Sequence, residues 1–367
     1  MKKIFILSFL IIILFSCKKS NTDNSNGGGG GNNDNKKVYA VGYVSIQDFF
    51  SRPRTAKLWI DTMETSLTDG TKDAIAIGVF LLGNDVYIAG FESNGSKKVA
   101  KLWKNNTAIS LTDGTKNAVA NEIFVVGTDV YVTGFEAYGI LGSDELTRPV
   151  LWKNGVANYL PISGTDKIAI ATSVCVLGSD VYVAGTEKIN VSGAYHYTAK
   201  LWKNGIATVI SSSTQILKST AVVKLSGTDI YTGNFEELTN GNKSFTVKKN
   251  GVTVSTIAGI SSNPNSNENT HDYQIAFAIA GTDVYVAGVN SANKNVVYKN
   301  GIEVPSLNST AHLGYNCMAV SSNDVYIGGL GSGNTNQGRS AYVKNGINTI
   351  LNNSIKNSQL LGIAIKN

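Results

Sequence analysis

Glutamate recurs at one position of an internal repeat, at the end of what the sequence predicts to be the second strand of each unit. The four copies are Glu92, Glu136, Glu187 and Glu236. If the units surround a common centre, these carboxylates form an arc that could hold a cation or a polar ligand. A recurring carboxylate also has a structural explanation, because it can accept hydrogen bonds from backbone N–H groups of the following loop. The sequence favours the structural explanation.

The arginines of the chain all fall in segments predicted to be loops between the second and third strand of a unit; they are Arg52, Arg54, Arg148 and Arg339. A guanidinium group presents a planar fork that matches a carboxylate. The alternative is that each arginine sits on a solvated loop or caps a local turn. Taken together, the four arginines suggest that one face of the protein recognises an acidic ligand.

The same predicted loops carry aromatic residues that have no counterpart in the other units. They are Phe49, Phe50, Tyr138, Tyr195, His196 and Tyr197. Exposed rings could stack on sugar or peptide groups, whereas packing of the loops onto the rim of the fold is the structural alternative. With Arg54, Arg148 and Arg339, these residues are the candidate ligand-binding set for a glycan, a peptide or a protein.

Catalytic signatures are absent from the sequence. It contains no Gly-x-Ser-x-Gly, no His-Glu-x-x-His, no phosphate-binding loop and no calcium-loop pattern. The histidines, His196, His271 and His312, are isolated. His196 is already among the binding candidates. His271 and His312 each precede a first strand on the side of the variable loops, and His271 joins the candidates. We predict no catalytic residue, no metal site and no cofactor.

Two alternatives to a binding module stay open. A polysaccharide-acting lyase or hydrolase would need acidic and basic side chains to converge on one face, and the candidates are Glu92, Glu136, Glu187, His271 and Arg148. A structural accessory subunit of an envelope complex would instead expose a large apolar patch.

The elements that position these residues come from a repeat. A Gly or Ser turn, an Asp and a Val/Ile-Tyr pair recur roughly every 40 to 50 residues, a period typical of propeller blades. The phrase is found at Asp85, Asp129, Asp180, Asp229, Asp283 and Asp324, and a degenerate copy spans residues 38–42.

One well-preserved unit predicts four strands, at residues 118–127, 129–134, 151–153 and 157–160. The turn after the first strand is Gly-x-Asp and the turn after the third is usually Lys-Asn-Gly, both typical of tight hairpins. The first two strands are nearly continuous in apolar residues, as in a sheet covered on both faces. We therefore predict four-stranded antiparallel blades.

The predicted first strand occurs seven times, but the chain begins on a second strand, at residues 38–42, and ends on a first strand, at residues 359–365. The fold predicted for residues 37–367 is therefore an all-β, seven-bladed β-propeller closed by pairing of its N-terminal and C-terminal strands. Such pairing would remove the exposed sheet edges. We expect the propeller to be monomeric.

The repeat resembles kelch-like propellers and the Trp-Lys-Asn-Gly repeat proteins of exported bacterial lipoproteins. The resemblance covers residues 38–367 and rests on a second strand ending in Gly, a variable loop, and a third strand with an aromatic residue and a tight turn, as in residues 151–155. A double glycine, typical of kelch repeats, occurs after the second strand only at Gly328 and Gly329. The resemblance implies a fold and an exported protein, and it leaves the function open.

The N-terminal segment has the pattern of an export signal. Lys2 and Lys3 precede a short apolar run, residues 4–15, and Leu-Phe-Ser-Cys at residues 14–17 resembles the bacterial lipobox. An ordinary signal peptide with a chance cysteine is the alternative. We predict a signal peptide at residues 1–16, lipidation of Cys17, and a Gly/Asn/Ser-rich tether at residues 17–36. The protein would then be lipid-anchored in the cell envelope, with the outer membrane favoured.

Net charge, the remaining cysteines and the tryptophans each bear on the partners or the packing of the protein. The formal net charge is +6 without a basic block, and Lys2 and Lys3 contribute to it, so no nucleic-acid partner is expected. Cys175 and Cys317 fall on predicted first strands and are expected to be buried thiols without a disulfide. The tryptophans share one position of the third strand, which indicates packing between blades: Trp59, Trp103, Trp152 and Trp202.

Overall fold

The computed structural model describes most of the chain after residue 35. The described residues are 36–45, 52–141, 144–163, 168–191, 194–213, 221–237, 243–261, 276–292, 294–308, 313–332, 338–351 and 357–367. The predicted signal peptide and Cys17 lie outside them, and so do Phe49, Phe50, His271 and His312. Within the described residues, no helix is both long and apolar enough to span a bilayer.

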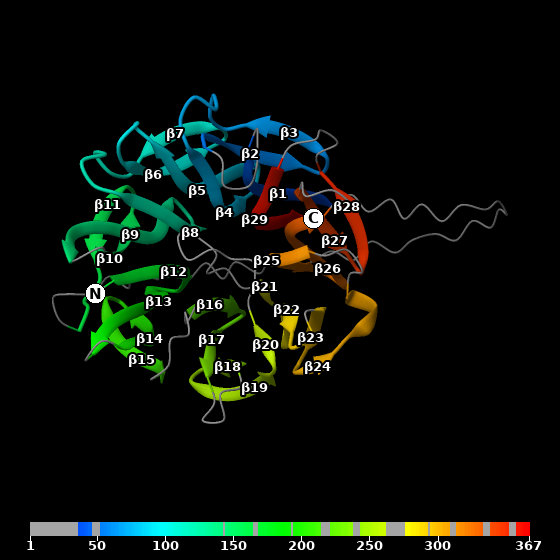
Figure 1. Cartoon of the computed structure of the whole chain (residues 1–367). Helices are drawn as coiled ribbons and strands as arrows, with labels where there is room; N and C mark the ends of the chain where they lie inside the picture. Colours follow the sequence, from blue (N-terminus) through cyan, green and yellow to red (C-terminus); the bar gives the residue numbers. More distant parts are fainter. Residues whose placement is uncertain are drawn as a thin grey trace, which may run out of the picture. The chain divides into compact units, whose positions relative to one another are not determined.

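The described part of the chain is all-β, with one short 3-10 helix, η1 (Pro305–Leu307). Antiparallel sheets follow one another along the chain and lie side by side in a propeller-like arrangement (Figure 1). The strands of the first half are β1 (Lys37–Ser45), β2 (Arg54–Ile60), β3 (Met63–Ser66), β4 (Ala74–Leu82), β5 (Asp85–Ser93), β6 (Lys98–Lys104), β7 (Thr107–Ser110), β8 (Ala118–Val126), β9 (Asp129–Leu141), β10 (Asp144–Lys153), β11 (Val156–Tyr159), β12 (Ile168–Leu177), β13 (Asp180–Val191), β14 (Ala194–Lys203) and β15 (Ile206–Ser213).

The second half continues the same pattern. Its strands are β16 (Ala221–Ser226), β17 (Asp229–Glu237), β18 (Lys243–Lys249), β19 (Val252–Ala258), β20 (Ile260–Ser261), β21 (Ala276–Ala280), β22 (Asp283–Asn290), β23 (Asn295–Lys299), β24 (Ile302–Glu303), β25 (Leu313–Ser321), β26 (Asp324–Ser332), β27 (Gly338–Lys344), β28 (Ile347–Ile350) and β29 (Asn357–Lys366). Four sheets are four-stranded, with the orders β29-β1-β2-β3, β4-β5-β6-β7, β16-β17-β18-β19 and β25-β26-β27-β28. The sheet of β20 to β24 has five strands.

Strands β8 to β15 form one eight-stranded sheet. It contains two four-stranded antiparallel groups, β8 to β11 and β12 to β15, joined by a single parallel bridge between Thr147 and Ile168. In this sheet two four-stranded groups are joined, whereas the other groups form separate sheets. The bridge lies in the part of β10 that precedes residue 151, where the sequence predicted a loop.

The first strand of each group lies next to the first strands of its two neighbours. Contacts run from β4 to β8, β12, β16, β21, β25 and β29, and β29 in turn contacts β4. The last strand, β29, also pairs antiparallel with β1, from Lys37 opposite Lys366 to Ser45 opposite Asn357. The two ends of the described chain are thus held in one sheet.

A recurring cluster of side chains fixes the tight turns, at what we call the turn edge of each sheet. In the sheet of β8 to β11, Asn154 and Gly155 form the turn with φ of 51° and 81°, as a type I′ hairpin requires. Asn154 Oδ1 accepts the N–H of Val130 at 2.8 Å, and its Nδ2 donates to Asp129 Oδ1 at 2.8 Å. Lys153 Nζ lies 2.9 Å from Asp129 Oδ2 and 5.2 Å from the ring centre of Tyr131.

The same Asp–Lys–Asn arrangement recurs at Asp85, Asp180, Asp229, Asp283 and Asp324. These aspartates therefore serve the turns, which explains why the phrase repeats.

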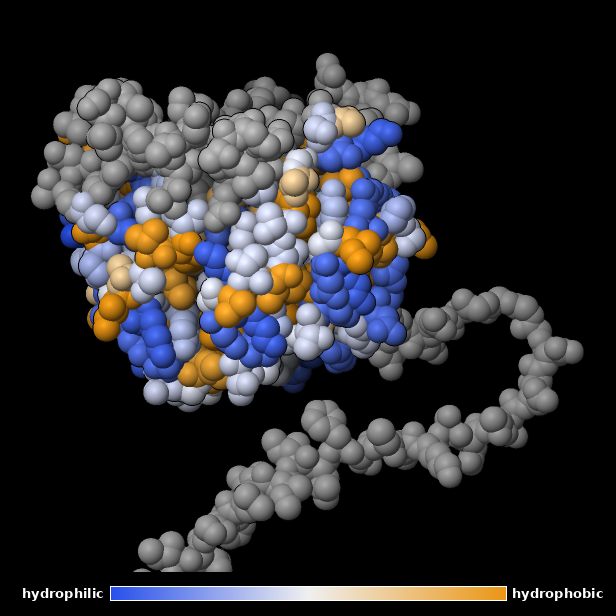
Figure 2. Space-filling model, turned by 90° about the horizontal axis from the view of Figure 1, so that it is seen from below, coloured by the Kyte–Doolittle hydropathy of each residue, from blue (hydrophilic) through white to orange (hydrophobic). Residues whose placement is uncertain are grey.

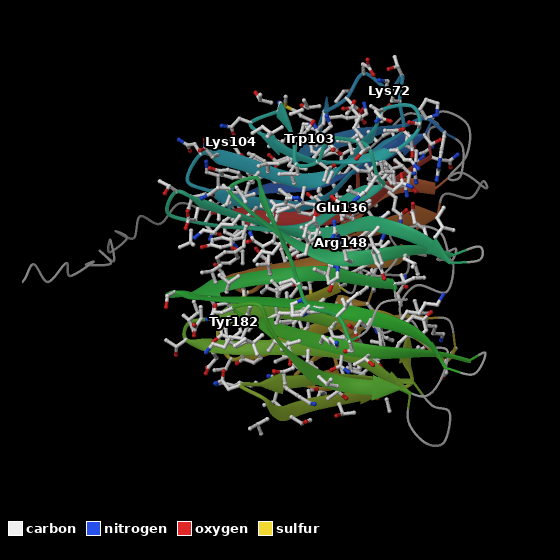
Figure 3. All side chains as sticks on the ribbon, turned by 90° about the vertical axis from the view of Figure 1, so that its left-hand side faces the viewer. Lys72, Trp103, Lys104, Glu136, Arg148 and Tyr182 are labelled. Atoms are coloured by element: carbon white, nitrogen blue, oxygen red, sulfur yellow. The ribbon has the colours of Figure 1, made fainter. Side chains whose placement is uncertain are left out.

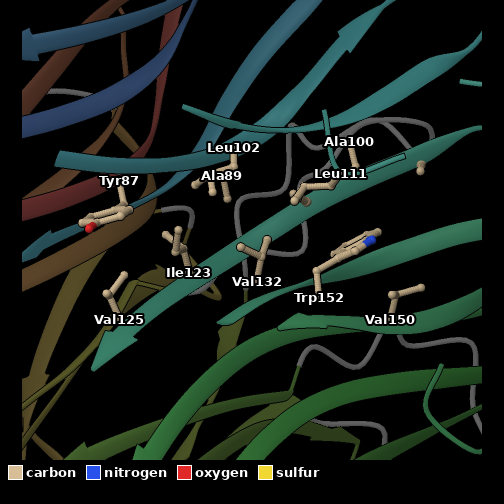
Figure 4. Close-up of a cluster of buried hydrophobic side chains, with 12 residues drawn as sticks. Tyr87, Ala89, Ala100, Leu102, Leu111, Ile123, Val125, Val132, Val150 and Trp152 are labelled. Carbon is tan, nitrogen blue, oxygen red and sulfur yellow. The ribbon is translucent and has the colours of Figure 1, made fainter. Parts of the chain in front are cut away.

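Each tryptophan packs against the end of the preceding four-stranded unit. Trp152 clusters with Leu111, and Trp103, Trp202 and Trp59 cluster in the same way with Leu67, Leu160 and Leu351. All four indoles are fully buried, and Figure 4 shows Trp152 and Leu111 in one such cluster. Where Lys248 takes the tryptophan position, its Nζ donates to the carbonyl of Ile210 at 2.9 Å. The prediction of packing between repeat units is confirmed.

Steric crowding explains why glycine stands at the end of the repeated phrase. A Cβ on Gly90 or Gly134 would lie 2.1 Å from the carbonyl oxygen of Ile75 or 1.9 Å from that of Val119, respectively. Both glycines face the point where the first strand bulges, between Ala76 and Gly78 or between Ala120 and Glu122. The bulge brings backbone against backbone, so only glycine fits.

Several residues that the sequence placed in loops between second and third strands lie in strands. Tyr138 lies in β9, Arg148 in β10, and Tyr195, His196 and Tyr197 in β14. The loop predictions for these residues were wrong, because the hairpins continue as hydrogen-bonded ladders to the pairs Leu141–Asp144 and Val191–Ala194. Arg339 likewise lies in β27.

Candidate functional site

The recurring glutamates occupy equivalent places near the end of the second strand of four groups. Three of them are ion-paired: Glu92 Oε2 lies 3.3 Å from Lys101 Nζ, Glu136 Oε1 2.9 Å from an Arg148 nitrogen, and Glu187 Oε2 2.7 Å from Lys200 Nζ. Glu236 lies in β17 opposite Ser244, and its side chain is outside the described part. The described carboxylates are therefore each neutralised within their own sheet.

Glu187 shows the structural role most clearly, because it is 2% exposed. It accepts hydrogen bonds from the N–H of Ser163 at 2.6 Å and from the hydroxyl of Ser163 at 3.0 Å, and Lys200 also donates to that hydroxyl. The glutamate thus ties β13 and β14 to the segment before β12. This agrees with the structural interpretation of the repeated glutamate.

Arg148 belongs to a cluster on β9, β10 and β11. Its guanidinium lies 3.4 Å from the ring centre of Tyr159, whose hydroxyl donates to Glu136 at 3.1 Å. Lys116 Nζ adds a second cation 3.6 Å from the same carboxylate. Figure 3 shows Glu136 and Arg148 side by side, away from the edge that carries Lys104 and Tyr182. Arg148 is thus engaged within the fold by its own glutamate and tyrosine.

Arg54 is not a loop residue, as the sequence suggested, but the first residue of β2, and it is 4% exposed. Its Nε and Nη2 each donate to Asp73 at 2.7 Å, and its backbone N–H donates to the same carboxylate at 3.1 Å. Burial disfavours its charge, but Asp73 outweighs that effect and raises the pKa of Arg54. Its guanidinium also lies over the ring of Tyr43, 5.2 Å from the centre.

The equivalent position in the next sheet is Lys98, which the sequence did not single out. Lys98 is the first residue of β6 and lies opposite Ser93, as Arg54 lies opposite Ser45. Its Nζ lies 5.1 Å from the ring centre of Phe91, in the way that Arg54 lies over Tyr43. The two cations therefore occupy matching surroundings.

The carboxylate partner differs between the two positions. The segments before β4 and β8 read LTDGTKDA (67–74) and LTDGTKNA (111–118), so Asn117 stands where the first segment has Asp73. Asn117 Oδ1 accepts the backbone N–H of Lys98 at 2.9 Å, just as Asp73 accepts that of Arg54, and its Nδ2 donates to Glu145 at 2.8 Å. The Lys98 ammonium has no carboxylate within 4 Å among the residues that the structure describes.

The surroundings of Lys98 are rich in positive charge. Burial lowers the pKa of Lys98, and the charges of Arg52 and Arg54 lower it further, against the weaker opposing effect of Asp73 and Glu145. Arg52 is half-exposed, with Nε 3.6 Å from Asp73. We call Arg52, Arg54 and Lys98, with Phe91 beneath, the cationic site. An incoming anion would relieve a charge that the fold has left uncompensated.

The other sequence-predicted residues do not join this site. Tyr197 is buried in β14, opposite Lys188, and the side chains of Tyr195 and His196 lie outside the described part. Tyr138 and Arg339 are half-buried in β9 and β27. No group of three or more potential metal ligands occurs in the described ranges.

A cavity lies at the turn edge. An open cavity of about 570 Å³ is lined by β21, β22, β25 and the end of β29, with Asp283, Tyr285, Lys299 and Asn367 at its wall. Asp283 and Lys299 pair with each other at 2.7 Å. The charges of these two side chains therefore compensate each other.

Comparison with known proteins identifies the fold only. No family model and no curated protein matches the chain, whereas many solved structures do. One is a puromycin-hydrolysing peptidase of Mycobacterium tuberculosis, with 12% identity and a TM-score of 0.50, over 84% of this chain and 53% of that one. This chain therefore spans about half of that peptidase.

Two further structures match at lower TM-scores. YjhT has 13% identity and a TM-score of 0.38, over 75% of this chain and 97% of its own. An exo-1,5-alpha-L-arabinanase from a bovine ruminal metagenomic library has 9% identity and a TM-score of 0.34, over 77% and 98%. At such low identity the likeness says nothing about activity.

Proposed function

We propose that this protein is an exported, lipid-anchored binding module that captures an acidic ligand, a glycan or a peptide bearing carboxylates, at the cationic site. The observation that carries the proposal is the unmatched Lys98. Its counterpart Arg54 is paired with Asp73, whereas the residue in the place of Asp73 is the neutral Asn117, which accepts the backbone N–H of Lys98. Binding without catalysis fits the described carboxylates, because Glu92, Glu136 and Glu187 are each held by a cation of their own sheet.

The scaffold that we propose is a seven-bladed propeller closed by β29. Its blades would be the five sheets with four or five strands and the two halves of the eight-stranded sheet. The unbroken series of contacts between first strands, from β4 through to β29 and back to β4, supports closure, as does the pairing of β29 with β1. Kelch-like membership remains part of this proposal, on the strength of the repeat alone.

Recognition at the cationic site would combine charge and an aromatic surface. Arg52 is 57% exposed at its side chain and can reach a ligand without leaving Asp73 uncompensated, because Arg54 alone already binds both oxygens of Asp73. A ligand carboxylate beside Lys98 would gain a charge-assisted hydrogen bond in a partly desolvated place, where such bonds contribute about 1.5 to 3 kcal/mol. That corresponds to about a 10- to 100-fold change in Kd.

Attachment to the envelope rests on the sequence alone. The charged and apolar start of the chain and the lipobox-like residues 14–17 support export and acylation of Cys17. Metabolic labelling with an alkyne fatty acid tests this part: label should be incorporated by the natural chain and be absent from Cys17→Ala. Equal labelling of both chains would contradict it.

Binding is tested with polygalacturonate and poly-glutamate as acidic probes and with dextran as the neutral one. Calorimetry on the full chain should detect the acidic probes, and Lys98→Met should weaken binding by about 10- to 100-fold. Asn117→Asp is made together with Glu145→Gln, because the new carboxylate would otherwise face that of Glu145. This pair of changes places a carboxylate beside Lys98, as Asp73 stands beside Arg54, and should weaken binding to a similar extent and leave the fold intact.

The matched control is Lys97→Met, which removes the neighbouring positive charge in the same turn. It should change the affinity less than about threefold. If Lys97→Met and Lys98→Met weaken binding equally, only overall charge matters and the cationic site is refuted. Retained affinity in the Asn117→Asp, Glu145→Gln double variant would refute it as well.

A further inference from the structure

A belt of exposed aliphatic side chains follows the turn edge of the sheets. Six of the outermost strands begin with one, directly after the tight turn that follows the third strand, and each is between 66% and 76% exposed: Met63, Val156, Ile206, Val252, Ile302 and Ile347. The remaining outermost strand, β7, begins with Thr107 instead. Figure 2 shows apolar side chains recurring among hydrophilic ones from one sheet to the next.

The belt is more regular than the scattered apolar residues of an ordinary surface. Each of its members from Val156 onward is the cross-strand partner of the lysine of the Lys-Asn-Gly turn, as in the pairs Lys153–Val156 and Lys203–Ile206. The aliphatic group and the lysine therefore lie side by side on the same face of the sheet. Since these lysines are paired with the turn aspartates, the polar neighbours of the belt carry little uncompensated charge.

The chain enters this domain at the same edge. Lys36 Nζ donates to Asp324 Oδ2 at 2.8 Å and to the carbonyl of Ser321 at 3.2 Å, both in the turn between β25 and β26. The N–H of Val38 donates to Asp61 Oδ1 in the turn before Met63, at 2.9 Å. The point of entry is thus fixed at the turn edge, on the level of the belt.

We propose that the turn edge, with its belt, lies against the surface of the lipid bilayer that holds the anchor. The argument rests on the lipid anchor of the proposed function. Residues 18–35, rich in Gly, Asn and Ser, are all that separates Cys17 from this point of entry in the sequence. The edge where the chain enters would therefore stay close to the bilayer, and contact between the aliphatic belt and the lipids would stabilise it there. The cationic site lies on the opposite ends of the strands, at the start of β2 and β6, and would face away.

The experiment separates this docking from acylation in the cell. Protein that begins at Cys17, after the predicted signal peptide, is coupled through the thiol of Cys17 to vesicles that contain maleimide lipid, while Cys175 and Cys317 are buried and do not compete. The vesicles also carry a lipid with a photoreactive acyl chain, and crosslinked peptides are identified by mass spectrometry. Crosslinks are expected at the belt, above all in the peptides around Ile302 and Ile347, and not at Gly95 and Ser96, which lie exposed between β5 and β6.

A variant pair sharpens the test. Replacing Ile206, Ile302 and Ile347 by Ser should lower the lipid crosslinks at least tenfold, because three aliphatic groups leave the interface. The control replaces Ile109, Val209 and Val254 by Ser, which are 46%, 56% and 47% exposed but stand two or three residues farther from the turn in their strands. It should keep the crosslinking within about twofold.

Several outcomes would overturn the docking. An equal loss of lipid crosslinks in both triple variants would do so. Lipid crosslinks at Gly95 or Ser96 would also do so. If the belt variant changes only the mass of the protein in solution, a second copy covers the belt and the proposal is wrong. The vesicle experiment attaches Cys17 to lipid chemically, so its outcome does not depend on acylation in cells. Failure to find fatty acid on Cys17 in cells would refute the anchor without affecting the crosslinking result.

Discussion

Removing Asp73 should show how strongly the fold depends on the buried Arg54–Asp73 ion pair at the start of β2. The side chain of Arg54 is 4% exposed and that of Asp73 is 10% exposed. Asp73→Ala deletes the acceptor of three hydrogen bonds and leaves a guanidinium that burial alone disfavours. The loss of one partner from such a pair costs about 3 to 5 kcal/mol.

The assay is urea unfolding of wild type and Asp73→Ala, followed by tryptophan fluorescence, since all four tryptophans are buried between repeat units. The midpoint should fall while the slope of the free energy against urea stays constant. Arg54→Met combined with Asp73→Leu should recover most of the loss, because an apolar pair of similar volume avoids the desolvation of both charges.

The surface pair Lys104–Asp85 is the matched control, with side chains 44% and 39% exposed. Lys104→Met should shift the urea midpoint very little. A loss below about 1 kcal/mol for Asp73→Ala, or a double variant no more stable than the single one, would show that the pair is not an essential buried interaction.

Three further predictions concern the repeat. Gly90→Ala should destabilise by several kcal/mol, because its Cβ would lie 2.1 Å from the carbonyl oxygen of Ile75, whereas Gly83→Ala, which has open space and a φ of 59°, should cost about 1 to 2 kcal/mol in the same urea assay. Hydrogen bonds from Lys153 and Asn154 lower the pKa of Asp129, and the pKa values of Asp180, Asp229 and Asp283 are lowered in the same way. The stability that these carboxylates contribute is complete above a pH of about 4 and is lost as the pH falls through their folded pKa. Urea midpoints should therefore decline below pH 4, and a flat profile would contradict this. Burial raises the pKa of Cys175 to about 12 and that of Cys317 well above its usual range, so neither thiol should react with a disulfide reagent at pH 8 until urea is added; fast labelling of the folded protein would contradict their burial.

The repeat predicts the strands and turns because its residues are fixed by local chemistry. Asn154 and Gly155 need positive φ, and Gly134 must lack a side chain where β8 bulges. The pairing of residues 38–42 with the C-terminal strand follows from counting strands and is what the structure has. Local patterns thus carry most of the architecture.

The cationic site was not predicted because the residues that define it are far apart in the sequence. Arg54 meets Asp73 across 19 residues, and Lys98 differs from Arg54 only through Asn117. The signal is present in the sequence, as the single charged difference between LTDGTKDA (67–74) and LTDGTKNA (111–118). It becomes meaningful only once the structure shows that residues 73 and 117 face the start of the third strand.

Binding stoichiometry follows from the same comparison of units. In the four units with tryptophan, the position five residues before it holds Arg54, Lys98, Thr147 and Tyr197. Arg54 is paired, Thr147 donates its hydroxyl to the carbonyl of Ala169 at 3.0 Å, and Tyr197 is a neutral, buried side chain. Among these, Lys98 alone offers an unmatched charge, so a short acidic probe should bind once per chain despite the repetition of the fold.

Calorimetry with a glutamate trimer measures this number directly. The counterpart in β18 is Lys243, whose side chain lies outside the described part of the structure, and Lys243→Met serves as the control that should leave the stoichiometry at one. Two or more sites of equal affinity would mean that repetition itself, and not the change from Asp73 to Asn117, creates the binding surface.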